Sequence, residues 1–423
     1  MTCERSASFR LGFATAVLLA FTCVTAVQTL AQTYTVLHNF TGGADGSNPQ
    51  GGVTLQGTSN LFGGAGRTAL YRVRQVGAGW TFTPIFEFND TDGLFPSGRV
   101  TFGPDGALYG ATGSGGLPEC TDGAGCGVIY SMRPPSSFCR SISCPWTETI
   151  LYQFDPLHRV DGVYPNGSLV FDSAGNLYGA TGLGGMFGEG TVFELSPSQD
   201  GWTETILYNF GEQQSNGFVP LGHLIVDATA STIIGTTQIG GTGTGCFDGN
   251  CGVVFELTRN GSSWTDTILH NFNPATDGGE PSGGLISDAA GNLFGVTGEG
   301  GPNNGGTVYE LSPSGEGYTF QVLYAFTGMA GFVGPVGILA MDSAGNLYGA
   351  SGQGPSGHGF VFKLTPSGGR WTFTDLHDFT GADGNLPFDG PTLDASGNLY
   401  GTTYYGGTGS CSGGCGVIYQ MTP

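Results

Sequence analysis

The most constraining feature of this chain is a nine-residue phrase that occurs seven times. Five copies begin with tryptophan, and they contain all five tryptophans of the sequence. The copies are WTFTPIFEF from Trp80, WTETILYQF from Trp146, WTETILYNF from Trp202, WTDTILHNF from Trp264, WTFTDLHDF from Trp371, QTYTVLHNF from Gln32 and YTFQVLYAF from Tyr318. Every copy ends on phenylalanine, and the copies are spaced by about 50 residues, which marks a repeat architecture.

Each repeat unit is predicted to contain four short β-strands. In the clearest unit these are residues 167–172, 176–182, 190–196 and 202–210, which are rich in branched and aromatic residues and are separated by glycine-rich turns. Seven such units predict an all-β fold, namely a seven-bladed β-propeller of four-stranded blades. A β-solenoid is the alternative architecture for a repeat of this kind.

The two ends of the repeat array are complementary. The array opens on a fourth strand at 33–40 with no complete unit before it, and it stops at Pro423 after a third strand. We therefore predict that the N-terminal strand pairs into the last blade and closes the ring. Closure would remove the exposed sheet edges of an open array. A solenoid would not need such matching ends.

The composition argues against two other classes of glycine-rich protein. Glycine makes up 80 of the 423 residues, but the glycines have no three-residue period, which excludes a collagen triple helix. Aromatic residues make up 12% of the chain, and the apolar segments are regular, which argues against disorder.

The first 31 residues have the features of a secretory signal. Arg5 and Arg10 lie before an apolar run at 11–27. Ala26 and Ala31 each end a small-x-small pattern that suits cleavage by a signal peptidase. We expect residues 1–31 to be removed and residues 32–423 to form a single propeller domain, secreted or at the cell surface. An uncleaved membrane anchor is the alternative. No second apolar stretch is long enough to span a bilayer.

The chain is strongly acidic, with 33 Asp and Glu residues against 12 Lys and Arg, and a net charge of −21. Such a surface repels nucleic acid and anionic lipid, so we expect neither as a partner, and no membrane association after signal cleavage. It attracts cations, including calcium. We expect a monomer.

The eight cysteines that follow the signal segment form four close pairs. The pairs are Cys120/Cys126, Cys139/Cys144, Cys246/Cys251 and Cys411/Cys415. In an exported chain this pattern predicts local disulfides, each of which stiffens a loop tip. A zinc site is the alternative, but it would need four ligands in one place, and no histidines cluster near these pairs.

One polar motif, Asp-Gly-x-x-Pro, recurs in the connection from each fourth strand to the next unit. Its acids are Asp45, Asp92, Asp161, Asp277 and Asp383; the fourth copy has Asn216 instead, and the sixth, from Ala330, has no acid. In a propeller these connections share a rim with loops that carry cysteine pairs. The five carboxylates are therefore candidate ligands for a cation or a polyhydroxyl compound. No cofactor is required, and calcium is the metal that such oxygen ligands suit.

The alternative interpretation of the motif is turn chemistry. Asp would cap the turn, Gly would take a left-handed conformation, and Pro would fix the entry to the strand. We likewise interpret the Trp and Phe residues of the phrase as packing between blades rather than as a ligand ring. The histidines of the phrase occupy a position that is tyrosine in other copies: His38, His270 and His377 against Tyr152, Tyr208 and Tyr324. This exchange indicates a structural position.

The phrases GNLYGTT, GTVFEL and WTETILYNF resemble the Gloeo/Verruco (GloVer) tandem-repeat proteins over nearly all of residues 32–423. The resemblance implies an exported bacterial, propeller-like module without an established activity. Related choice-of-anchor members carry C-terminal surface anchors, whereas this chain ends at Pro423 directly after a repeat, so free secretion is an alternative to retention at the cell surface. The Asp-x-x-Gly-Asn-Leu-Tyr phrase is also similar to repeats of calcium-dependent lactonase and NHL-type propellers, but their metal ligands do not map onto this sequence.

Two functions of different classes follow from these observations. The first is an extracellular binding or adhesion module for carbohydrate or protein, suggested by export, repetition and the lack of a serine-nucleophile elbow, a zinc-protease motif or a phosphate loop. The second is an extracellular hydrolase or lyase, lactonase-like or acting on polysaccharide, that would use rim carboxylates and calcium. We favour the first and assign no catalytic residue.

Overall fold

The structure is a computed structural model that describes residues 32–117, 120, 125–135, 145–155, 157, 160–246, 251–315, 317–328 and 334–422. The segment predicted to be a signal, residues 1–31, lies outside the described residues. Within the described part, the chain forms β-strands, and its helical content is the three-residue 3-10 turn η2 (Gln214–Asn216). The predicted all-β class is therefore confirmed.

The strands fall into four sets according to their place in the repeat. The first strands are β2 (Thr54–Gln56), β6 (Leu94–Phe102), β10 (Gly162–Phe171), β14 (Phe218–Val226), β18 (Gly279–Pro281) with β19 (Ile286–Ser287), β23 (Pro335–Met341) and β27 (Thr392–Leu393). The second strands are β3 (Asn60–Ala65), β7 (Leu108–Ser114), β11 (Leu177–Gly184), β15 (Thr232–Ile239), β20 (Leu293–Glu299), β24 (Leu347–Ser351) and β28 (Leu399–Thr403).

The remaining two sets complete the units. The third strands are β4 (Ala69–Val76), β8 (Val128–Arg133), β12 (Thr191–Ser198), β16 (Val253–Asn260), β21 (Asn304–Ser314), β25 (Phe360–Ser367) and β29 (Val417–Thr422). The fourth strands are β5 (Gly79–Glu87), β9 (Thr147–Gln153), β13 (Gly201–Asn209), β17 (Ser263–Asn271), β22 (Gly317–Thr327), β26 (Arg370–Asp378) and β1 (Thr33–Asn39). Each fourth strand carries one copy of the repeated phrase.

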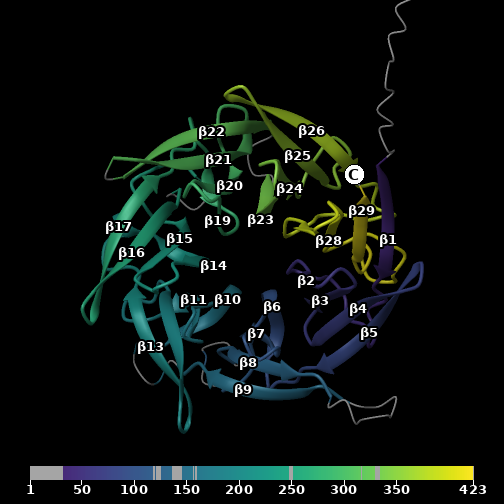
Figure 1. Cartoon of the computed structure of the whole chain (residues 1–423), viewed down its shortest axis with the longest axis horizontal. Coiled ribbons are helices and arrows are strands. Elements are labelled where there is room, and N and C mark those ends of the chain that lie inside the picture. The colour runs from purple at the N-terminus through teal and green to yellow at the C-terminus, as the bar shows by residue number, and fades with distance from the viewer. Residues whose placement is uncertain are drawn as a thin grey trace, which may run out of the picture. The chain divides into compact units, whose positions relative to one another are not determined.

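Every unit is an antiparallel sheet whose strands pair in chain order, except at the ends of the array. The units of β10–β13 and β14–β17 are joined into one sheet through a single parallel bridge, Ser168 with His223. At the ends, β1 pairs antiparallel with β29, from Thr33 opposite Thr422 to Asn39 opposite Val417. Within Gln32–Pro423 the sheets are arranged around a common centre, with first strands innermost and fourth strands outermost (Figure 1). The arrangement is propeller-like.

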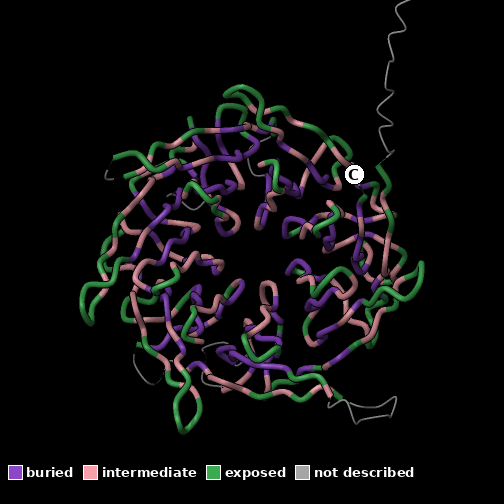
Figure 2. Tube along the Cα trace, viewed as in Figure 1, coloured by how far each residue is buried: buried purple, intermediate pink, exposed green. Residues whose placement is uncertain are grey.

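Burial follows the position of a strand in its unit. Second and third strands are buried on both faces, as in β24 and in Leu177–Thr181 of β11, whereas fourth strands alternate between exposed and partly buried residues. Figure 2 shows the buried segments lying between the inner turns and the exposed outer hairpins. Strands sandwiched between neighbouring sheets must be apolar on both sides, which explains their continuous apolar runs.

The aromatic residues of the phrase pack between neighbouring units, as predicted. The phenylalanine that ends each copy is buried, and Trp80, Trp146, Trp202 and Trp371 contact an aromatic ring of the preceding unit edge-on. Trp202, for example, lies 6.3 Å from Tyr109 between ring centroids, and Trp146 lies 5.8 Å from Phe62. Each unit therefore buries its fourth strand against the sheet that precedes it.

The turn between first and second strands follows the sequence prediction. Asp172 accepts hydrogen bonds from the backbone N–H groups of Ala174 and Asn176, and Gly175 has a φ of +88°. The aspartates at 288, 342 and 394 make the same bonds in their own units. This turn is therefore a repeated Asx turn that needs a left-handed residue.

The disulfide prediction is confirmed for three of the four pairs. Cys120–Cys126, Cys246–Cys251 and Cys411–Cys415 are bonded, and all three bridges lie between a second and a third strand. Cys139 and Cys144 lie outside the described residues. Because each bridge closes a short loop, it restrains that loop locally and leaves the pairing of sheets to the core.

The first strands begin earlier than predicted, and most contain a bulge. The unit expected to start at Gly167 starts at Gly162, and the register between β10 and β11 shifts between Asn166 and Val170. The same shift occurs in β6, β14 and β23. The bulge places Gly167 against the neighbouring first strand, where a Cβ atom would lie 2.1 Å from the carbonyl oxygen of Gly222. Backbone therefore meets backbone at the centre of the fold.

This contact predicts different effects for alanine at two glycines with similar backbone angles. Gly167 and Gly175 have φ values of +83° and +88°, but a Cβ at Gly175 meets no atom within 4 Å. We expect Gly175→Ala to lower the free energy of unfolding by about 1 kcal/mol, the strain of a left-handed alanine. Gly167→Ala should lower it by roughly 3 kcal/mol or more, because neighbouring backbone must also move. Urea unfolding of both variants checks this, and equal losses would contradict it.

Candidate functional site

The five candidate aspartates each lie in a connection that follows a fourth strand. Each carboxylate accepts a hydrogen bond from the backbone N–H group of the residue after the buried phenylalanine. The donors are Thr41 to Asp45, Asn89 to Asp92, Asp155 to Asp161, Asn273 to Asp277 and Thr380 to Asp383. This is the turn chemistry that the sequence offered as the alternative to ligand binding.

Four of these carboxylates also bind the ring at the seventh position of the phrase. His38, Tyr152, His270 and His377 place a polar ring atom 2.6–3.0 Å from Asp45, Asp161, Asp277 and Asp383 respectively. The histidine rings stack on aromatic rings of a neighbouring unit, as His38 does on Phe82 at 3.8 Å. Histidine and tyrosine are thus interchangeable here because both carry a polar atom on a flat ring, which confirms the structural interpretation of the histidines.

The structure does not gather the five aspartates into one site. Each is in the connection of a different unit, and in the described ranges no three His, Cys, Asp or Glu side chains form a group that could hold a metal ion. Ligand binding by the individual rim carboxylates, with or without calcium, stays a prediction.

Partly buried acids opposite these connections are a feature that the sequence analysis missed. Glu204 occupies the third position of its phrase, and Tyr152 places its hydroxyl 2.9 Å from Glu204 and 3.0 Å from Asp161. Burial raises the pKa of Glu204 to about 8, and the charge of Asp161 adds to the effect. Burial also raises the pKa of Glu148 to about 8, with a contribution from the charge of Asp92. Both glutamates therefore carry a proton at neutral pH.

The sequence did contain a signal for this arrangement. Where the seventh position is histidine, the third position of the neighbouring phrase is aromatic: Phe82, Phe320 or Tyr34. Where it is Tyr152 or Tyr208, the opposite residue is an acid, Glu204 or Asp266. One oxygen each of Glu204 and Asp161 is inaccessible to solvent and has no hydrogen-bond partner among the described residues. A protonated carboxyl beside an ionised one can exchange a proton, but burial of these oxygens favours a structural role.

A cavity of about 160 Å³ at the centre of the fold receives residues from all seven units. The cavity is lined by residues of a second repeated motif, Pro-x-Gly, which lies near the start of each first strand. The glycines are Gly51, Gly98, Gly167, Gly222, Gly283 and Gly337, and the seventh unit has Asp389 at this position. Close approach of neighbouring backbones requires glycine, since a Cβ on Gly98 would lie 2.2 Å from the carbonyl carbon of Gly167.

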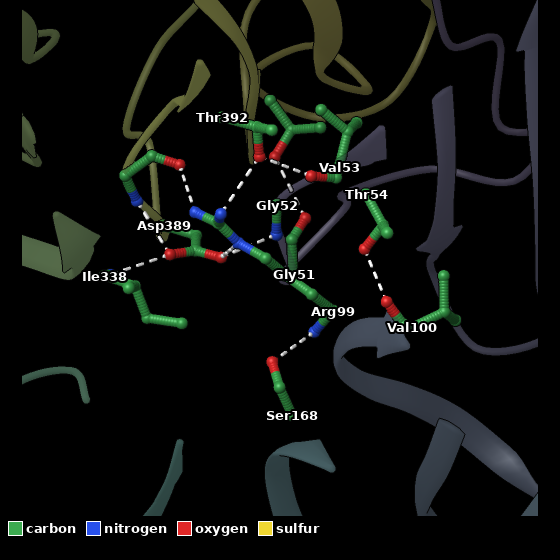
Figure 3. Close-up of polar contacts among 12 residues, drawn as sticks. Gly51, Gly52, Val53, Thr54, Arg99, Val100, Ser168, Ile338, Asp389 and Thr392 are labelled. Atoms are coloured by element: carbon green, nitrogen blue, oxygen red, sulfur yellow. Dashed lines mark hydrogen bonds and ion pairs between the residues drawn. The ribbon is translucent and has the colours of Figure 1, made fainter. Parts of the chain in front are cut away.

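Asp389, the exception to the glycine motif, pairs with Arg99 from a unit two places away (Figure 3). Arg99 Nε donates to Asp389 Oδ2 at 2.7 Å, and the side chains are only 16% and 9% exposed. The carboxylate also accepts the backbone N–H groups of Gly52 and Ile338. Burial would raise the pKa of Asp389, but the Arg99 charge and these bonds hold it below its ordinary value. The aspartate is therefore ionised and its charge is compensated.

All three guanidinium nitrogens of Arg99 donate a hydrogen bond to the unit that contains Asp389. Nη1 donates to Thr392 Oγ1 at 2.9 Å, and Nη2 donates to the Gly390 carbonyl at 2.6 Å. The backbone N–H of Arg99 donates to Ser168 Oγ at 3.1 Å. The pair thus ties together the units that begin with β2, β6, β10, β23 and β27, and each guanidinium nitrogen donates one of these hydrogen bonds.

His223 also lines the cavity, and it is uncharged at neutral pH. Burial, with a smaller contribution from the nearby Arg99 charge, lowers the pKa of its imidazole to about 4. Its Nδ1 atom is inaccessible to solvent and has no hydrogen-bond partner in the part of the chain that the structure describes. The cavity therefore holds one compensated ion pair and a neutral imidazole.

The side chains that line the cavity above the glycines are also uncharged. They stand between Pro and Gly in the motif and are Gln50, Ser97, Asn166, Leu221, Ser282 and Phe388. Phe388 is 39% exposed. Amides, hydroxyls, an aliphatic chain and an aromatic ring thus surround one opening on an otherwise acidic protein.

The buried glutamates predict that stability falls as the pH rises from 6.5 to 8. In this window Glu148 and Glu204 bind protons in the folded state, because their pKa is about 8, but not in the unfolded state, where the ordinary value is 4.5. Raised carboxyl pKa values therefore stabilise the fold at low pH, and this stability is lost as the pH approaches 8. His223 opposes the trend only slightly: in the unfolded state, where its ordinary pKa is 6.5, it loses about half a proton across this window, which raises stability by roughly 0.4 kcal/mol.

We expect a loss of on the order of 1 kcal/mol for each glutamate across this window, measured as the free energy of unfolding in urea. Glu204→Gln and Glu148→Gln should each flatten the dependence, and the double variant should remove most of it. A native protein whose stability is constant or rises from pH 6.5 to 8 would refute the protonated state of these acids.

Known proteins resemble this chain in two ways. The sequence profile of the Gloeobacter/Verrucomicrobia repeat matches residues 123–338, which is just over half of the chain. No curated protein matches. Among solved structures, a hypothetical selenium-binding protein from Sulfolobus tokodaii has a TM-score of 0.50 at 12% identity, over 75% of this chain and 76% of its own.

Two enzymes are more distant structural neighbours. A gluconolactonase from Xanthomonas campestris has a TM-score of 0.42 at 13% identity, over 84% of this chain and 90% of its own. An aldose sugar dehydrogenase from Streptomyces coelicolor, solved with bound PQQ, has a TM-score of 0.43 at 14% identity, over 79% and 96%. These likenesses are too weak to carry an activity. From the match of its repeats, the chain belongs to the Gloeobacter/Verrucomicrobia repeat family.

Proposed function

We propose that this protein is an extracellular binding module that holds an uncharged carbohydrate at the central cavity. As part of the proposal, the seven four-stranded units form a closed seven-bladed propeller, supported by the pairing of β1 with β29. Export is supported by three disulfides. Within the described residues, no helix has the length and apolar character needed to cross a membrane.

The observation that carries the proposal is the neutral lining of the cavity in a chain with a net charge of −21. Asp389 is compensated by Arg99, His223 is neutral, and the variable side chains above them carry no charge. Sugars are bound by amides and hydroxyls that meet their hydroxyl groups and by aromatic rings that cover their apolar faces. Gln50, Asn166 and Phe388 supply both kinds of contact.

The pattern of variation within the repeat supports the same site. Pro and, in six units, Gly are constant because they fix the strand entry and the backbone contact. The residue between them varies, being Gln, Ser, Asn, Leu, Ser, Val and Phe in the seven units, so packing does not require one residue type at this position. A constant frame with varied side chains around one opening is how repeat proteins build binding surfaces.

The test is binding of purified protein to an array of neutral and charged glycans, with calcium and with a chelator. We expect binding to neutral glycans, with affinity reduced roughly tenfold by Phe388→Ala, since loss of an aromatic contact costs about 1–2 kcal/mol. The matched control is Phe187→Ala. Phe187 is 42% exposed but lies outside the cavity, in the loop between β11 and β12, and its loss should leave binding unchanged.

Three results would count against the proposal. Absence of binding to any neutral glycan would remove the carbohydrate assignment and turn the search to protein partners. Equal effects of the Phe388 and Phe187 variants would move the site away from the central cavity. Binding that disappears with the chelator would assign the function to the rim aspartates instead.

A further inference from the structure

A cavity of about 350 Å³ lies between the unit of β6–β9 and the unit of β10–β13. These two units are neighbours around the common centre (Figure 1). We call this cavity the second-junction pocket. Its lining includes Tyr109, Ser131 and Arg133 from the first of these units and Phe171, Pro197 and Trp202 from the second. Among the described residues, it shares no lining residue with the central cavity.

Ser131 has the shortest side chain at its position in the repeat. The strand register places one residue of each third strand opposite the second-strand position that Tyr109 occupies in this unit. In the other units this third-strand residue is long and polar; it is Arg72, Glu194, Glu256, Glu310, Lys363 or Gln420. Six units therefore fill a position that the unit of β6–β9 occupies only with a hydroxymethyl group.

Long side chains at this position contact the ring that stands opposite them. Lys363 Nζ lies 5.3 Å from the ring centroid of Tyr348. The amide of Gln420 donates a hydrogen bond to the hydroxyl of its opposite tyrosine at 3.3 Å. A serine side chain ends at its γ oxygen, so Ser131 cannot reach along the ring of Tyr109 in this way. Space that a lysine or glutamine side chain fills in those units is therefore part of the pocket here.

The turn between β6 and β7 places an ion pair beside the same ring. Gly103 stands where the repeated Asx turn has its aspartate, and the acid of this turn is instead Asp105. Asp105 accepts a hydrogen bond from the Tyr109 hydroxyl at 3.1 Å and pairs with Arg133. The Asp105 and Arg133 side chains line the pocket and are 32% and 58% exposed. Hydroxyl groups of a ligand can therefore reach both partners of the pair.

The walls of the pocket define the class of ligand. Tyr109 meets Phe171 and Trp202 edge-on, with ring centroids 4.8 and 6.3 Å apart, and all three rings line the pocket. Aromatic walls with a few polar groups suit the apolar face and the hydroxyls of a sugar. The opposite charges of Asp105 and Arg133 leave no net charge to select an ion. We propose that the second-junction pocket binds a pyranose sugar, in the space that a long side chain fills in other units.

A sugar in this pocket occupies a different place from the sugar proposed for the central cavity, so each site can be lost without the other. Trp202 provides a signal for this pocket alone, because it lines the second-junction pocket and does not line the central cavity. Ser131 provides the matching substitution, because a longer side chain at this position fills the pocket without removing any of its walls.

The test is an NMR titration of the full protein, isotopically labelled at tryptophan, with the methyl pyranosides of glucose, galactose, mannose and xylose. The indole N–H signal of Trp202 is assigned from the spectrum of Trp202→Phe. We expect at least one glycoside to shift this signal and Ser131→Gln to abolish the shift. Arg133→Met should weaken binding roughly tenfold, the effect of losing a hydrogen bond to a charged group.

Folding failure is controlled within the chain itself. Gln420 occupies the position of Ser131 in another unit, so the fold accommodates glutamine there. Glu256→Gln, at the same position of a third unit, is the matched control and should leave the titration unchanged.

Four results would overturn the proposal. They are no shift of the Trp202 signal with any glycoside, a shift that survives Ser131→Gln, and equal losses in the Ser131 and Glu256 variants. The fourth is a shift that disappears in Phe388→Ala, which would place the sugar in the central cavity. Tighter binding of n-butylammonium, which resembles a lysine side chain, would assign the pocket to cations and would also contradict the sugar assignment.

Discussion

The buried pair of Arg99 and Asp389 is the contact on which the centre of this fold depends. First strands approach so closely that six of the seven units have glycine at the point of contact, and the seventh has an aspartate that must be neutralised. Arg99 neutralises it from two units away, while Asp389 also holds backbone N–H groups of two further units. Removing either partner would leave an uncompensated charge in a poorly hydrated place, which is costly.

That constraint also determines where recognition can occur. Backbone contacts and the ion pair fix the floor of the central cavity, so its chemistry can vary only at the position between Pro and Gly. At the rim, by contrast, the aspartates are engaged by backbone N–H groups and rings, and their variation follows packing partners.

Much of the architecture was predictable because it depends on local pattern. Four strands per unit, the Asx turn at Asp172, the packing role of Trp202 and three local disulfides all follow from residues close together in the sequence. The location of the five rim aspartates in the connections was predictable for the same reason. Their hydrogen-bond partners were less predictable. Asp161, for example, binds the ring of Tyr152, and the sequence does not show the register that brings this strand residue to the connection.

Contacts between distant units were not predictable in this way. Arg99 and Asp389 are 290 residues apart, and neither belongs to a motif of known chemistry. A signal was nevertheless present, since Asp389 replaces a glycine found in six other units. The buried state of Glu204 was hidden because its strand alternates like a surface strand; only its pairing with Tyr152 across the junction shows that it faces inward.

The most direct test of this account is a double-mutant cycle with Arg99→Met and Asp389→Asn, measured by equilibrium unfolding in urea. The account predicts that each single variant loses about 3–5 kcal/mol, as expected when one partner of a buried pair is removed. The double variant should lose far less than the sum of the two, which gives a coupling energy of about 2 kcal/mol or more. Additive losses, or single variants as stable as the native chain, would show that the centre of the fold does not depend on this pair.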